Sequence, residues 1–137
     1  MKKNTFLGIA GLALMGFASC GGSEDCAPAG TWSVTSTPQT GDTCTDAAET
    51  SSRVVTVMGG NATITDPSDG SSVSGGLDSS CHMGWVTAIS SSDVVAAGSS
   101  EVTFTGSTLA GTVNAHATFT ADNSMCTVKL KLVGVRL

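Results

Sequence analysis

Apolar and polar residues alternate with a period of two along much of the sequence after residue 30. In residues 108–120, apolar or small residues such as Leu109, Val113 and Ala117 alternate with threonine, asparagine and histidine. Successive side chains of a β-strand point to opposite faces, so this pattern predicts a strand with one buried face. The alternation argues against disorder, although serine, threonine and glycine, which are abundant here, are common in unfolded chains.

Turn residues separate the alternating segments and determine how they pair. Three hairpins are predicted, about turns at Gly59-Gly60, Gly106-Ser107 and Ala121–Ser124. Pairing about each turn superimposes the apolar faces of the two strands, as a hairpin buried on one side requires. Val57 is expected to face Ala62 at the first turn. At the third turn, Phe119 is expected to face Cys126.

Further strands are predicted at residues 30–37, with Trp32 on the buried face, and at 82–89, within a less regular stretch from 72 to 97. Short strands joined by such turns predict an all-β antiparallel meander of six to eight strands, as one domain over residues 30–137. A meander avoids exposed edges best by closing into a barrel, and a β-sandwich is the alternative.

The N-terminus has the parts of a secretory signal peptide. Lys2 and Lys3 precede an uncharged apolar run from Phe6 to Phe17, and small residues follow before Cys20. The apolar run is shorter than the roughly 20 residues that a membrane-spanning helix needs.

The four residues Phe17-Ala18-Ser19-Cys20 resemble the lipobox of bacterial lipoproteins, in which an apolar residue and two small ones precede a cysteine. The resemblance implies that residues 1–19 are a cleaved signal peptide, that Cys20 carries a diacylglyceryl group, and that its new amine is acylated. Residues 20–29 would then be a lipidated tether in the cell envelope. Gly21 replaces the aspartate that retains such proteins at the inner membrane of enteric bacteria, which favours the outer membrane.

The number of cysteines supports lipidation. The chain has five, and an odd number in a secreted protein leaves one that needs an explanation. Lipidation of Cys20 leaves four, which can form two disulfides in an oxidising compartment. The alternative is an ordinary signal peptide with Cys20 in a disulfide.

The charge of the mature part argues against nucleic acid as a partner. Lys2 and Lys3 belong to the signal peptide, so four of the six basic residues face eleven acidic ones. Such a surface repels a phosphate backbone. Lys129, Lys131 and Arg136 lie together near the C-terminus but are too few for a polybasic membrane patch, so the lipid on Cys20 is the expected membrane contact.

The tripeptide Gly30-Thr31-Trp32 resembles the Gly-x-Trp motif of lipocalins and related small barrels. The resemblance implies a barrel in which a basic residue of the last strand packs on this tryptophan, and Arg136 is in phase to do so through a cation–π contact. The layout also resembles uncharacterised proteobacterial lipoproteins, a likeness that implies no activity.

Four cysteines allow three pairings, and a barrel favours one of them. In an up-and-down barrel, Cys44 follows the first strand and Cys126 begins the last, so both lie at the same end of neighbouring strands. Cys26 and Cys81 fall at the other end. We therefore predict the disulfides Cys44–Cys126 and Cys26–Cys81.

Catalytic and metal-binding patterns are scarce. His116 falls on the solvent face of its predicted strand, and His82 adjoins Cys81 in a predicted loop. No spacing typical of a zinc site, a nucleophile elbow or a phosphate-binding loop occurs. Residues 66–70 share aspartate and glycine with calcium loops, but a turn explains them better. Carboxylate pairs stay open as an alternative; we expect no enzyme, no catalytic or metal-ligating residue and no cofactor.

Two functions fit such a domain. The first is a binding module that holds a small apolar ligand in the barrel, because inward residues such as Gly111, Ala115 and Ala117 are small. A cavity of roughly 300 Å³ or more would favour this function. The second is a structural or interaction protein with a filled barrel that binds an envelope protein. One such case would be a barrel resembling periplasmic protease inhibitors, with residues 21–29 as its N-terminal arm.

Overall fold

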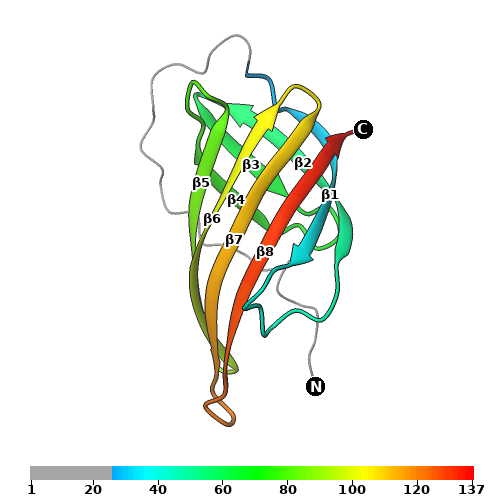
Figure 1. Cartoon of the computed structure of the whole chain (residues 1–137). Helices are drawn as coiled ribbons and strands as arrows, with labels where there is room; N and C mark the ends of the chain where they lie inside the picture. Colours follow the sequence, from blue (N-terminus) through cyan, green and yellow to red (C-terminus); the bar gives the residue numbers. More distant parts are fainter. Residues whose placement is uncertain (1–25) are drawn as a thin grey trace.

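The computed structural model describes residues 26–137, which form a single sheet of eight antiparallel strands (Figure 1). The predicted signal peptide and Cys20 lie outside the described residues. The strands are β1 (Gly30–Pro38), β2 (Glu49–Met58), β3 (Asn61–Thr65), β4 (Ser72–Gly76), β5 (His82–Ser90), β6 (Val94–Thr105), β7 (Thr108–Phe119) and β8 (Met125–Arg136). No helix among these residues is long and apolar enough to cross a membrane.

The sheet curls into a nearly closed barrel. The strand order is β4-β3-β2-β1-β8-β7-β6-β5, so that the first and last strands of the chain are neighbours and Trp32 pairs with Arg136. Across the remaining seam, a bridge joins Leu77 to Met83. A Cβ atom added to Gly75 would lie 2.4 Å from the carbonyl oxygen of Gly84, so glycine lets β4 and β5 approach. The predicted all-β meander is confirmed, and it forms one sheet rather than a two-sheet sandwich.

Two of the predicted hairpin registers are confirmed, and the third is wrong by two residues. Val57 pairs with Ala62 about the first turn. In the β7–β8 hairpin, Ala117 rather than Phe119 pairs with Cys126. The turn lies one residue earlier than expected, at residues 120–123, since the Phe119 N–H donates to the Ser124 carbonyl over 2.8 Å. A shift of two residues keeps every side chain on its predicted face, since side chains alternate with a period of two.

One end of the barrel, here called the closed end, is filled by Trp32 and covered by residues 26–29 (top of Figure 1). The Trp32 Nε1–H donates to the Pro28 carbonyl over 2.8 Å, and the Pro28 side chain is itself fully buried. The indole packs edge-on against Phe104 with ring centroids 5.3 Å apart. On its other side the guanidinium carbon of Arg136 lies 5.0 Å from the ring centroid, and Arg136 also donates to the Ala27 carbonyl.

The opposite end, here called the open end, is held together by the loop between β1 and β2. The Asp42 carboxylate accepts hydrogen bonds from the backbone of this loop and from the Lys129 N–H of β8 over 2.8 Å. Cys44 is disulfide-bonded to Cys126 at this end, with Cα atoms 5.3 Å apart. The second disulfide joins Cys26 to Cys81 at the closed end, also with Cα atoms 5.3 Å apart. Both predicted disulfides are therefore confirmed, as is their placement at opposite ends.

Candidate ligand-binding cavity

The barrel contains a cavity of about 140 Å³ that is partly open to solvent and is lined by residues from all eight strands. Pockets for drug-sized ligands occupy about 300–1,000 Å³, so this cavity is too small for such a ligand. It is close to the roughly 150 Å³ of an engineered apolar cavity that binds benzene. Its size therefore suits a single small molecule.

Small residues at inward positions of β6 and β7 leave this space. Gly98 pairs with Ala115, and Ser100 pairs with Val113, so that little side-chain volume fills the middle of these strands. An added Cβ would meet the neighbouring strand at both inward glycines, 2.3 Å from the Asn114 carbonyl oxygen at Gly98 and 2.1 Å from the Glu101 carbonyl oxygen at Gly111. The two strands therefore lie close together, and the cavity is left because their small residues present little side-chain volume to the interior.

The cavity has one apolar and one mixed wall. The apolar wall comes from β5, β7 and β8 and includes Trp85, Ile89, Val113, Ala115, Val128 and Leu130. The facing wall comes from β1, β2 and the turn between β3 and β4, and its polar members are Ser36, Ser51, Arg53, Asp66, Ser71 and Ser72. A ligand in this space would therefore meet an apolar surface on one side and polar groups on the other.

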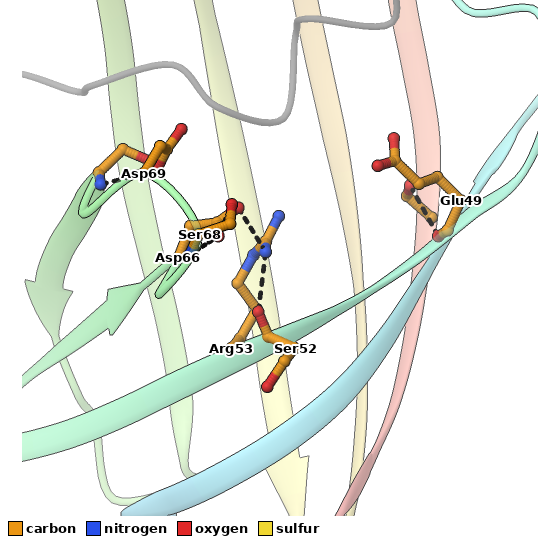
Figure 2. A network of polar contacts seen from close by, with 8 residues as sticks. Glu49, Ser52, Arg53, Asp66, Ser68 and Asp69 are labelled. Atoms are coloured by element: carbon orange, nitrogen blue, oxygen red, sulfur yellow. Dashed lines mark hydrogen bonds and ion pairs between the residues drawn. The ribbon is translucent and has the colours of Figure 1, made fainter.

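An ion pair between Arg53 and Asp66 is the main polar feature of the cavity (Figure 2). Arg53 Nη1 lies 2.6 Å from Asp66 Oδ2, and the two side chains are only 10% and 11% exposed. The same Nη1 donates to the Ser52 carbonyl over 2.9 Å. The other carboxylate oxygen, Asp66 Oδ1, accepts hydrogen bonds from the Ser68 N–H and hydroxyl, over 2.8 and 2.6 Å. The turn therefore fixes the carboxylate, and the carboxylate positions the guanidinium.

Hydroxyl groups add further polar atoms to the wall. The Ser36 hydroxyl is satisfied, since it donates to the Glu49 carbonyl over 3.3 Å. Ser100 pairs with Trp85 across β5 and β6 and is only 8% exposed. Ser100 also lines the cavity. Its hydroxyl is not one of the buried side-chain atoms without a partner in the described part of the chain, so it serves as a polar group of the cavity surface.

Ionised aspartates contribute to two exposed turns, one of them beside the ion pair. The hydroxyl and N–H of Ser71 lower the pKa of Asp69 below its usual value, the N–H donating over 2.8 Å. In the β7–β8 turn, Ser124 lowers the pKa of Asp122 in the same way. A folded-state pKa below the unfolded value stabilises the fold at neutral pH, and this contribution is lost as the pH falls below about 4. Both carboxylates are solvent-exposed, so the effect on either turn is small.

The other residues that drew attention in the sequence lie outside the cavity. His82 lies at the closed end between two carboxylates, 3.6 Å from Asp78 and 3.3 Å from Glu101. His116 is exposed, with Nδ1 3.2 Å from the Thr127 hydroxyl. Within the described part of the chain, no three His, Cys, Asp or Glu residues cluster in a way that could hold a metal ion. Residues 66–70 form the turn that carries the ion pair.

Arg53 and its pairing with Asp66 were not predicted. A signal was present in the sequence, because Arg53 is in phase with Val55, a buried residue of the same strand. A charged residue at an inward position of a barrel strand indicates either a buried partner or a polar cavity. Here both are found.

Comparison of the chain with protein-family models, with curated proteins and with solved structures found no match. Its class therefore follows from its own geometry. The fold and the cavity define a small, disulfide-bonded, eight-stranded antiparallel barrel with a partly open interior of mixed polarity.

Proposed function

We propose that this protein is a lipid-anchored binding protein of the bacterial cell envelope that holds a small ligand in its barrel cavity. The cavity is the observation that carries the proposal. Larger inward side chains in place of Ala115 or Ser100 would occupy part of the 140 Å³ and bury more apolar surface, at about 25 cal/mol per Å². The small residues present leave this stabilisation unused. Ligand binding accounts for the presence of the cavity. The proposed activity is binding and not catalysis.

The alternative is an interaction protein that binds an envelope protein by its surface. Binding by the surface does not require a cavity inside the barrel. The version that resembles protease inhibitors needs a free N-terminal arm, but residues 26–29 pack over the closed end, where Pro28 is buried and Ala27 accepts a hydrogen bond from Arg136. Both observations favour ligand binding.

The proposed lipid anchor gives the barrel an orientation. Cys26 is fixed at the closed end by its disulfide to Cys81, and five residues lie between it and Cys20. A chain of that length spans at most about 20 Å. The closed end would therefore face the membrane, the outer one by preference, and the open end would point away from it, where a ligand can enter.

The anchor can be tested by substituting Cys20 with serine in the full-length chain. We expect the variant to leave the membrane fraction and to incorporate no radioactive palmitate, because serine cannot form the thioether. Wild-type protein should fractionate with membranes and carry the label. A variant that stays in the membrane fraction and takes up palmitate would contradict lipidation at this residue.

Binding in the cavity can be tested with cyclohexanone, a molecule of about the size that the cavity admits. At ten times its dissociation constant, a ligand that binds only the folded state adds about 1.4 kcal/mol of stability, or roughly 5 °C in Tm for a domain of this length. Ala115→Leu should abolish this shift by filling the cavity. Ala110→Leu, on the exposed face of the same strand, should leave it unchanged. Absence of a shift in the wild-type protein would count against the proposal.

A further inference from the structure

From the geometry of the cavity we infer the chemical class of the ligand: a small neutral molecule with an apolar body and a single hydrogen-bond-accepting oxygen. In this arrangement the oxygen accepts from Arg53 and Ser100, while the apolar body lies against Trp85 and the β7–β8 wall. The inference rests on the proposed function and specifies the ligand of that same cavity.

Some N–H donors of the Arg53 guanidinium have no acceptor in the described part of the chain. An arginine side chain carries five N–H donors in a rigid planar fork. Residues 26–137 provide partners only for Nη1, which contacts Asp66 and Ser52. Figure 2 shows the other terminal nitrogen directed away from both contacts. A ligand that fills the cavity displaces the water that can reach these donors, so the cavity favours an occupant with an acceptor atom at this place.

Ser100 of β6 adds a second polar group to the cavity surface, and the residue is only 8% exposed. Its hydroxyl can donate as well as accept, so it can donate to the same oxygen that Arg53 binds. The guanidinium can only donate, and it therefore decides for an oxygen acceptor, such as the carbonyl of a ketone, aldehyde or lactone.

The charge balance selects a neutral ligand over an anion. Asp66 already neutralises Arg53, and both of its oxygens are occupied, one by Arg53 and one by Ser68. A carboxylate entering the cavity would bring a negative charge with no positive partner of its own, next to the Asp66 carboxylate. Removing such a charge from water without a partner is costly. A cationic ligand would meet Arg53 and find no free carboxylate oxygen on Asp66.

The rest of the cavity determines the size and the apolar nature of the body. Trp85, Val113 and Leu130 present hydrocarbon and an indole, which favour an apolar surface over a polyhydroxylated one. A space of about 140 Å³ is close to that of a cavity that holds benzene, so one six-membered ring with a short substituent fills it.

Three probes of one shape test the inference by titration calorimetry on the intact domain. Cyclohexanone has the acceptor oxygen, methylenecyclohexane replaces that oxygen by a CH₂ group, and cyclohexanecarboxylate carries a charge. We expect cyclohexanone to bind about tenfold tighter than methylenecyclohexane, as expected for a hydrogen bond to a charged donor. Cyclohexanecarboxylate is expected to bind weakest of the three.

Variants assign the selectivity to the residues. Arg53→Met/Asp66→Asn removes both charges, while the asparagine Oδ1 can still accept from Ser68, so the turn is kept. This double variant should keep only the few-fold preference for cyclohexanone that the Ser100 hydroxyl supplies. Ser100→Ala should reduce the preference for cyclohexanone a few-fold. Lys131→Met, on the exposed face of β8, is the matched control and should preserve the preference.

The outcomes separate the inference from the proposed function. The inferred ligand class would be wrong if the wild-type protein bound all three probes equally, or if it bound the carboxylate most tightly. In both cases the proposed function, ligand binding in the cavity, would still stand. A preference for cyclohexanone that is undiminished in the double variant would overturn the role of Arg53. Failure of every probe to bind would overturn the ligand class and the proposed function together.

Discussion

Replacement of both Cys44 and Cys126 by alanine is expected to lower the free energy of unfolding by about 4 kcal/mol. The disulfide closes a loop with a sequence separation of 82 residues and so restricts the unfolded chain strongly. The substitution also removes the covalent tie between β8 and the loop after β1 at the open end. Equilibrium denaturation in urea, compared with the wild-type protein, measures the loss.

The loss is large relative to the total stability of such a domain, which is about 5–15 kcal/mol. Many inward residues of this barrel are small, so apolar burial supplies less stabilisation than in a core of large side chains. The matched control is Cys26→Ala/Cys81→Ala, whose separation of 55 residues gives a similar entropic effect.

The two disulfide variants should differ in where the protein loosens. Loss of Cys26–Cys81 frees residues 26–29 and exposes Trp32, whose indole N–H is bonded to Pro28. Loss of Cys44–Cys126 should leave Trp32 in place, with unchanged tryptophan fluorescence of the folded state. A destabilisation below about 1 kcal/mol in the Cys44 variant would show that the loop is restrained without the disulfide.

The fold could be predicted from the sequence more completely than the cavity could. Strand faces and the disulfides follow from alternation and from the up-and-down path, because the side-chain period of two leaves each residue a single choice of face. The register about Ala121–Ser124 was wrong, because the turn begins one residue earlier and the position of a turn depends on local backbone angles. Asn123, with φ at 56°, adopts one that most residues avoid.

The irregular stretch from 72 to 97 shows a second limit. β4 is only five residues long, and a bridge between Leu77 and Met83 links it to β5. Such a short strand has few positions at which apolar and polar residues can alternate, so its sequence pattern is weak. The cavity is a third limit, since small inward residues such as Gly98 and Ala115 are compatible with either close packing or an open interior. The distance between the barrel walls decides whether the interior is packed or open, and the sequence pattern does not give that distance.

The second large effect is expected at the ion pair of the cavity. Arg53→Met alone should lower the free energy of unfolding by about 3 kcal/mol, because it leaves the Asp66 carboxylate with no cationic partner. We expect the lower end of the range for buried pairs, since the cavity is partly open and water can reach the remaining charge. Urea denaturation at neutral pH measures the loss.

The double variant Arg53→Met/Asp66→Asn separates the cost of a lone charge from the value of the pair. Replacing a buried pair by neutral groups of similar volume is often neutral or stabilising, so the double variant should be close to the wild-type protein in stability. If the barrel loses no stability with the pair, folding does not explain why the pair is present. Ligand binding does, because Arg53 lines the cavity and can donate to a ligand there. If Arg53→Met by itself changes the stability by less than about 0.5 kcal/mol, the pair behaves as a solvent-screened surface contact, and the polar wall loses its role in choosing a ligand.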